Sequence, residues 1–183
     1  MKPNQIRRVV DTVVGMSAVK RFHGRSTIHT QSIADHSCRV AMLSYFIALE
    51  YYDGDINKAN YLSTCGLFHD FSESLLQCDV AAPLKGKFGI GTELRKLEES
   101  VVDSVFDTQH LKDLVLENAG TEDFNIMKLS DVLDFGLYVR EEISLGNSNM
   151  LCLVDIFSKE MIKYPDKLLS LDFVHKCIDK ILG

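Results

Sequence analysis

The chain has 183 residues, a length that suits one domain with a sizeable core. Its 20 Lys and Arg against 26 Asp and Glu give a net charge of −6, which argues against binding to nucleic-acid phosphates or to an anionic membrane. With 46% hydrophobic and 25% charged residues, the composition is that of a globular protein, not of a disordered one.

The sequence shows neither a membrane span nor a secretory signal. The longest apolar stretch, residues 40–49, is much shorter than the ~20 residues that cross a bilayer. Residues 1–8 lack the apolar run and the small-residue cleavage site of a signal peptide. The five cysteines are widely spaced and form no Cys-x-x-Cys pair. They are typical of reduced core thiols, so we expect a cytoplasmic protein without a thiolate-bound zinc site.

Apolar residues recur with a helical period along nearly the whole chain, which contains only three prolines. This pattern predicts an all-helical fold in a single domain, residues 1–183. The first expected helix carries an apolar stripe and ends near residues 15–19; the stripe comprises Ile6, Val9, Val10, Val13 and Val14. The other expected helices cover residues 32–52, 56–76, 93–106, 111–118, 124–145, 150–163 and 169–182. The connecting loops include residues 20–31 and the segment that follows Pro83.

The second predicted helix has a recognisable start. The Ser32 hydroxyl can accept a backbone N–H, and Asp35 lies in the positively polarised first turn, as in a capping box. His36 follows directly and precedes Val40 by four residues, which places its imidazole on the core side of this helix. The adjacent pair His69-Asp70 lies in the apolar stretch 62–71, although such a dipeptide is a weak signal by itself.

A third element supplies another candidate ligand. Asp131 lies in the apolar stretch 126–133, so we expect its carboxylate to be buried, which is costly unless it is paired or bound to a metal. Two imidazoles and two carboxylates from three helices would satisfy one another through a divalent cation such as Mn, Co, Fe, Ni or Zn. Alternatively, His69 and Asp70 pair locally and Asp131 forms a hydrogen bond within the core.

Glu73 is a candidate proton acceptor. It lies four residues after His69 and three after Asp70, so on a continuous helix it shares their face. A carboxylate beside the cation can take a proton from a water whose pKa the cation lowers. The alternative is a solvated helix residue.

Candidate substrate-binding side chains gather in two loops. Arg offers a bidentate fork for phosphate oxygens and Lys a mobile charge, although such residues are often only solvated. They are Lys20, Arg21 and Arg25 ahead of His36, and Lys85 and Lys87 after Pro83. Phe22 is able to stack on a base or sugar or to act as a half-buried anchor. Asp79 is able to accept a hydrogen bond from a sugar hydroxyl or to cap a turn.

These motifs, in this order, resemble the HD-domain metal-dependent phosphohydrolases, and among them the 5′-deoxynucleotidases. The similarity covers about residues 20–147, with the helices in 150–182 packing on that core; its motifs are segments 33–42, 67–73, 79–85 and 128–133. The resemblance implies one divalent metal ion (Co, Mn, Zn, Mg or similar) bound by His36, His69, Asp70 and Asp131. It assigns Glu73 to the attacking water or the leaving group.

The resemblance also implies a substrate, a deoxynucleoside monophosphate hydrolysed to deoxynucleoside and phosphate. Arg21 corresponds to the family's phosphate-binding arginine, and Asp79 to the aspartate near the sugar 3′ side. Phe22 occupies the position of a tryptophan that packs where a ribose 2′-hydroxyl would lie, but it lacks the indole N–H. Family members are usually homo-oligomers, so we expect a dimer or a hexamer.

A second branch with the same motifs comprises the short phage dATP triphosphohydrolases, which release triphosphate. In that branch Pro83 would contact the base and Lys85 the phosphate tail, and the compartment would be the host cytoplasm. Gly24 stands where that branch has a bulky aliphatic residue of the base pocket. A third possibility is a non-catalytic HD nucleotide sensor, although all four ligand positions and Glu73 are present.

Overall fold

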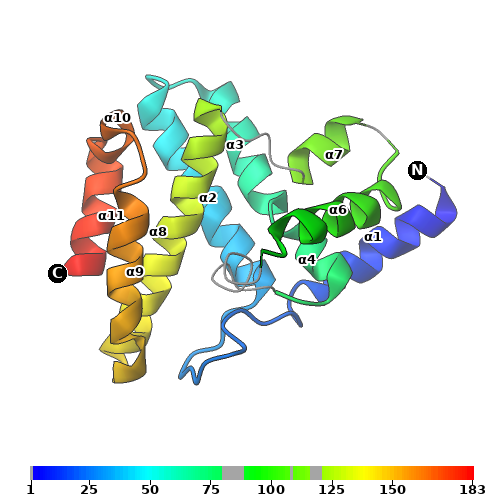
Figure 1. The fold of residues 1–183 in the computed structure, drawn as a ribbon. Coiled ribbons are helices and arrows are strands. Elements are labelled where there is room, and N and C mark those ends of the chain that lie inside the picture. The colour runs from blue at the N-terminus through cyan, green and yellow to red at the C-terminus, as the bar shows by residue number, and fades with distance from the viewer. Residues whose placement is uncertain (1, 80–88, 108, 116–120) are drawn as a thin grey trace. The chain divides into compact units, whose positions relative to one another are not determined.

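The computed structural model describes residues 2–79, 89–107, 109–115 and 121–183, and the ordered elements of these ranges are helical (Figure 1). Their one β-type pairing is an isolated antiparallel bridge between Lys20 and Ser32. In chain order the helices are α1 (Pro3–Gly15), α2 (Ile33–Tyr51), α3 (Ile56–Phe68), α4 (Phe71–Leu76), α6 (Gly91–Asp103), α7 (Gln109–Val115), α8 (Glu122–Ser144), the 3₁₀ helix η1 (Ser148–Met150), α9 (Leu151–Met161), α10 (Asp166–Leu169) and α11 (Asp172–Leu182). The all-helical prediction is confirmed. Within the described part of the chain, no helix is long and apolar enough to cross a membrane.

The stretch 56–76 departs most from its prediction, because it forms two helices instead of one. α3 ends at Phe68 and α4 begins at Phe71, so the break falls on His69 and Asp70. On a continuous helix, neighbouring side chains point about 100° apart. The break instead brings His69 Nε2 within 3.2 Å of Asp70 Oδ2.

The contacts divide the chain into two compact units. The first unit comprises residues 1–25, 30–37 and 68–118, and the second comprises 26–29, 38–67 and 119–183. By this division, the first turn of α2 belongs to the first unit and the rest of that helix to the second.

The first unit has a small core of its own around α4, which packs against α1 and α6. The core consists of Phe71, Val102, Val105 and Phe106, with Val9, Met16, Phe68 and Leu75 packed against it. Of the apolar stripe predicted on α1, only Val9 therefore joins this core; Ile6, Val10, Val13 and Val14 are 50–73% exposed. A hydrogen bond from the Ser74 hydroxyl to the Thr12 carbonyl (3.0 Å) ties α4 to α1.

In the second unit, α8 packs alongside α9 and α11 (Figure 1). Leu129 and Leu133 of α8 and Phe157 of α9 are fully buried in the core of this unit. At Gly136, an added Cβ would lie 2.7 Å from the Phe157 ring, so α8 and α9 approach each other more closely than a larger residue would allow. α8 is thus a firmly packed element, and it carries Asp131.

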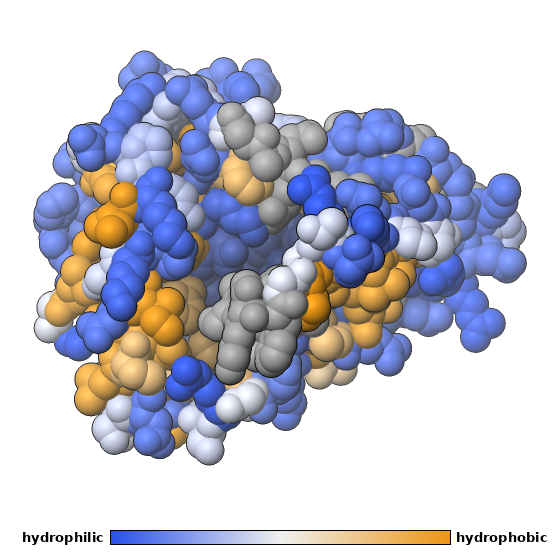
Figure 2. Space-filling model, in the orientation of Figure 1, coloured by the Kyte–Doolittle hydropathy of each residue, from blue (hydrophilic) through white to orange (hydrophobic). Residues whose placement is uncertain are grey.

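None of the five cysteines is fully buried, although we expected core thiols. Cys38, Cys78 and Cys152 are exposed, and Cys65 and Cys177 are half-buried. Apolar side chains also reach the surface of the face drawn in Figure 2. The expected burial of the cysteine thiols was wrong.

Candidate metal centre

The start of α2 positions the first histidine. The Asp35 N–H donates to Ser32 Oγ (3.1 Å), and the Ser32 N–H donates to Asp35 Oδ2 (3.0 Å), which confirms the predicted capping box. The Ile33 N–H donates to the carbonyl of Val19 (2.9 Å), so the preceding loop also holds this helix start. Because the cap fixes the first turn, the His36 side chain enters the interior with no exposed surface.

Three potential ligand atoms converge in the first unit. His36 Nε2 lies 3.2 Å from His69 Nε2, and Asp70 Oδ2 lies 3.3 Å from the former and 3.2 Å from the latter. The side chains of His36 and His69 are at most 1% exposed, and that of Asp70 is 19% exposed. The α3/α4 break thus lets two consecutive residues present ligand atoms to the same point.

This triangle fits a divalent cation. Ligand atoms held about 2.0–2.2 Å from a common metal ion lie roughly 3–3.5 Å from one another, which agrees with the three observed distances. Two imidazole nitrogens and one carboxylate oxygen form a mixed donor set that suits Zn, Mn, Co, Fe or Ni. The two Nε2 atoms face each other. Each can accept a hydrogen bond only if the other donates one, whereas both could bind the same cation as ligands.

The electrostatics of Asp70 agree with this interpretation. Burial by itself would raise the pKa of the carboxyl, but the imidazole of His69 and hydrogen bonding with His36 hold that pKa well below its ordinary value. The group is therefore an ionised carboxylate, the protonation state that ligates a metal ion.

Glu73 lies in the first turn of α4 and is 8% exposed. The break after α3 places it on a different helix from His69, so the expected shared helical face does not exist. Its N–H instead donates to the Asp70 carbonyl (3.1 Å), which makes it part of the turn that follows the His-Asp pair. Glu73 remains a candidate proton acceptor on the basis of its burial and this adjacency in the chain.

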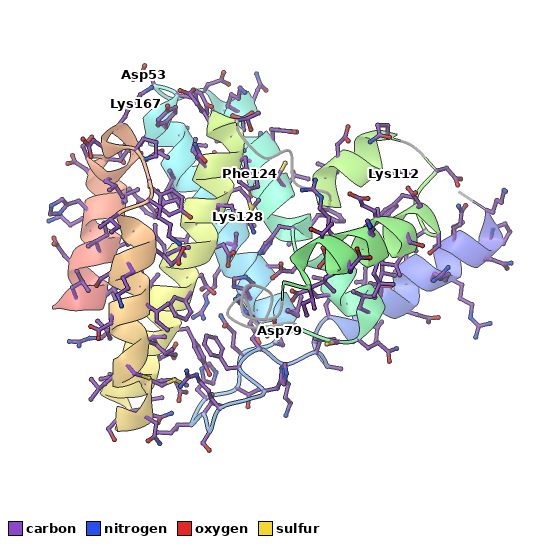
Figure 3. All side chains as sticks on the ribbon, viewed as in Figure 1. Asp53, Asp79, Lys112, Phe124, Lys128 and Lys167 are labelled. Atoms are coloured by element: carbon purple, nitrogen blue, oxygen red, sulfur yellow. The ribbon has the colours of Figure 1, made fainter. Side chains whose placement is uncertain are left out.

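Asp131 lies on α8, in the second unit, and its side chain is 25% exposed. Lys128 Nζ lies 3.6 Å from its Oδ2 (Lys128 is labelled in Figure 3). The expectation of a buried carboxylate was therefore wrong in degree. The fully buried acids of this helix are Asp134, whose Oδ1 lies 2.7 Å from Arg39 Nε, and Glu142.

The loop ahead of α2 carries Arg21 and Phe22, both half-buried. The Arg21 N–H donates to the Gln31 carbonyl (2.9 Å), and its guanidinium carbon lies 5.9 Å from the centre of the Phe22 ring. Phe22 has a φ of 57°, a left-handed conformation that is strained for a bulky residue. The Arg25 N–H donates to the Phe22 carbonyl (2.8 Å) and closes this turn.

Asp79 is half-buried after the end of α4 (labelled in Figure 3) and lines a cavity of about 780 Å³ in the first unit. Lys20 and His23 line the same cavity, whose volume is in the range of small-molecule sites. The remaining predicted contacts, Pro83 and Lys85, lie outside the described residues.

Sequence reasoning missed a set of polar residues on and after α8. Glu142 is fully buried and accepts hydrogen bonds from the N–H groups of Ile28 (2.8 Å) and His29 (2.6 Å) and from the Asn147 side chain (2.7 Å). Tyr138 Oη donates to the His29 carbonyl (2.5 Å). The available signal was an acidic residue inside the apolar helix predicted over 124–145.

The environment of Glu142 keeps its carboxyl ionised. Burial by itself would raise the pKa, but the hydrogen bonds from Asn147 and from the N–H groups of Ile28 and His29 lower the pKa below its ordinary value.

Relatives of known sequence match most of the chain. The family model described as 5′-deoxynucleotidase YfbR-like matches residues 9–179. The 5′-deoxynucleotidase of Vibrio atlanticus is 27% identical over 143 residues, which cover 72% of this chain and 73% of that protein. The 5′-deoxynucleotidase YfbR of Salmonella typhi is 29% identical over 144 residues, which cover 73% and 71%.

A solved structure shows the same fold. The cyanophage S-2L HD phosphohydrolase DatZ, bound to dA and one catalytic Zn²⁺ ion, matches with a TM-score of 0.69 at 15% identity, covering 99% of this chain and 96% of DatZ. At this identity the likeness concerns the fold. The chain therefore has the all-helical fold of HD-domain phosphohydrolases. Because the family model spans residues 9–179, a range that includes every metal-ligand candidate, the chain belongs to the YfbR-like 5′-deoxynucleotidase family.

Proposed function

We propose that this enzyme hydrolyses deoxynucleoside 5′-monophosphates to deoxynucleoside and phosphate, with a divalent cation bound by His36, His69, Asp70 and Asp131. The observation that carries the proposal is the triangle of ligand atoms from His36, His69 and Asp70, in a chain of this family. Both units together would form one HD domain, 1–183, acting on a small molecule in the cytoplasm and binding neither nucleic acid nor membrane.

The chemistry needs charge at the phosphate and a path for one proton. When bound, the cation supplies positive charge that stabilises the charge developing on the phosphate oxygens. Arg21 adds a bidentate donor for those oxygens. Glu73 accepts a proton as a water oxygen bonds to phosphorus, and returns it to the 5′ oxygen as the P–O5′ bond breaks. Its position supports this role, because Glu73 is buried and lies in the turn that directly follows the His-Asp pair.

Selection of the sugar falls to Phe22 and Asp79. The left-handed backbone of Phe22 costs free energy that an ordinary surface loop has no reason to store, which supports a functional constraint on this side chain. Packing of the ring against C2′ would leave no room for a ribose hydroxyl. The carboxylate of Asp79, which lines the cavity of the first unit, would accept a hydrogen bond from the 3′-hydroxyl.

Product analysis tests the proposal. The protein, supplemented with Mn²⁺ or Co²⁺, is given dAMP, AMP, dATP and dGTP in parallel. Phosphate from dAMP and not from AMP is the expected result. Triphosphate from dATP would instead assign a phage-type triphosphohydrolase activity, with dGTP testing whether Gly24 relaxes the choice of base. A chain that binds the metal and hydrolyses none of the four would be a nucleotide sensor.

We also propose a homo-oligomer, a dimer or a hexamer. The support is the exposed apolar stripe of α1, in which Val13 is 55% and Val14 is 73% exposed. Light scattering on the wild-type chain and on Val10→Ser/Val14→Ser measures the oligomer size. A monomeric wild-type chain at micromolar concentration would contradict this part of the proposal.

A further inference from the structure

Residues 26–29, which directly follow the loop of Arg21 and Phe22, are fixed on the end of α8. The two carboxylate oxygens of Glu142 accept hydrogen bonds from the backbone N–H groups of Ile28 (2.8 Å) and His29 (2.6 Å), one bond on each oxygen. The Asn147 side chain joins the loop to the helix, because its Nδ2 donates hydrogen bonds to Glu142 Oε2 (2.7 Å) and to the Ser26 carbonyl (2.9 Å). All these residues belong to the second unit.

The position of Glu142 is not explained by the helix that carries it. It lies two residues before the end of α8, where the helix dipole is negative and disfavours a carboxylate. It is also fully buried, and an ionised group there is costly without donors. The donors that compensate this cost come from the loop 26–29 and from Asn147, so the carboxylate serves the loop and not the helix.

The chain is short between this anchor and the strained turn. Three residues separate Phe22 from Ser26, and a hydrogen bond from the Arg25 N–H to the Phe22 carbonyl (2.8 Å) spans them. On the other side, the Arg21 N–H is held by the Gln31 carbonyl (2.9 Å). A left-handed Phe22 persists only if the backbone on both sides is restrained.

We infer that Glu142 is a positioning residue for sugar selection: by fixing residues 26–29, it restrains the turn that carries Phe22. The inference rests on the proposed function for its effect on substrates, whereas the anchoring itself is independent of any activity. Glu142 acts through Phe22 and touches no substrate.

A matched control exists in the same unit. Glu50 lies one residue before the end of α2, and its two carboxylate oxygens accept the N–H groups of Asp172 (2.6 Å) and Phe173 (3.0 Å) at the start of α11. The Glu50→Gln substitution therefore removes the same charge from an acid that also accepts two consecutive backbone N–H groups, but from a less buried site that joins α2 to α11.

The first readout is NMR-detected amide exchange of wild type, Glu142→Gln and Glu50→Gln. In Glu142→Gln, we expect the amides of Ile28, His29 and Arg25 to exchange faster by about tenfold or more, since a charge-assisted acceptor is lost. In Glu50→Gln, the faster amides should be those of Asp172 and Phe173. Unchanged exchange at Ile28 and His29 in Glu142→Gln would overturn the inference.

The second readout is the ratio of kcat/KM for dAMP to that for AMP. We expect Glu142→Gln to lower this ratio by about threefold or more, because a looser Phe22 admits the 2′-hydroxyl, and Glu50→Gln to leave it unchanged. Equal ratios in the two variants would also overturn the inference. If wild type hydrolyses neither substrate, the proposed function fails, and exchange at Arg25 alone decides whether Glu142 restrains the turn.

Tyr138→Phe covers the case in which Glu142→Gln does not fold. It removes the hydrogen bond from the Tyr138 hydroxyl to the His29 carbonyl and leaves the buried ring in place. The same two readouts should change in the same direction by a smaller factor, and wild-type values in both would count against the inference.

Discussion

The two units bury charge in different ways. In the second unit, the carboxylate of Glu142 is met by three N–H donors, and Asp134 lies 2.7 Å from the Arg39 guanidinium. In the first unit, His36 and His69 bring two Nε2 atoms to within 3.2 Å of each other, beside the Asp70 carboxylate. The first pattern matches each buried acid with donors, whereas the second brings together nitrogen and oxygen atoms that would all bind one cation.

Convergence of ligand atoms, and not burial alone, therefore marks the metal centre. Glu142 is more buried than Asp70, yet its hydrogen bonds are complete within the protein. Variants in the two units should therefore fail in different ways. Changes at the converging ligand atoms of the first unit should remove metal and turnover, and loss of Asp134 or of the Glu142 charge in the second unit should lower stability.

The largest expected effect is that of His69→Ala. Loss of one ligand from the triangle should abolish stoichiometric metal binding and lower kcat/KM by about 10³-fold or more, because the phosphate charge is no longer stabilised. Metal content by mass spectrometry and phosphate release from dAMP measure the two losses. His175→Ala, at an exposed histidine of α11, is the control and should retain both properties. Full metal content in His69→Ala would remove this residue from the ligand set.

Glu73→Gln should separate catalysis from metal binding. The amide cannot accept the proton, so we expect kcat to fall by about 10²–10⁴-fold while metal content and KM change little. Glu99→Gln, on an exposed helical pair with Arg95, serves as the control. Near-normal kcat in Glu73→Gln would show that another group moves the proton.

Asp134→Ala tests the second unit. Removing this buried carboxylate leaves the Arg39 guanidinium only its longer contact with Glu141 (3.6 Å). Because Arg39 is 36% exposed, we expect a loss of about 2–3 kcal/mol of unfolding free energy, below the value for a fully buried pair. Urea unfolding measures this loss, and metal content should stay at the wild-type level. A metal-free but stable variant would contradict the contrast between the units.

The sequence predicted the helices and the cap well, because both depend on local patterns. Ser32 and Asp35 form the expected reciprocal hydrogen bonds, since a capping box needs only residues three apart. The break at His69 and Asp70 was not predicted, because Phe68 and Phe71 continue the apolar pattern across it. Periodicity reports which residues are apolar and cannot show that a helix is interrupted between them.

The burial of the acids on α8 was also beyond local reasoning. The apolar surroundings of Asp131 predicted a buried carboxylate, whereas Glu142 follows the charged residues Arg140 and Glu141, so this argument favours the wrong acid. Which acid is buried depends on a loop, residues 26–29, that is more than a hundred residues away in the chain. Only the tertiary structure distinguishes Asp131, whose side chain is 25% exposed, from the fully buried Glu142.

The smallest expected effect is a pH dependence of stability that belongs to Glu142. Its pKa is lowered from 4.5 in the folded chain, so its stabilising contribution is complete above that value and is lost as the pH falls through the lower folded value. Wild type and Glu142→Gln should differ by about 1–2 kcal/mol at neutral pH, since a charged acceptor of backbone N–H groups is replaced by a neutral one. Urea unfolding of both chains between about pH 7 and pH 3.5 should show this difference shrinking below about pH 4.5. A difference that stays constant over the whole range would mean that the charge of Glu142 does not hold the loop, and the contrast between matched and converging buried charges would lose its clearest example.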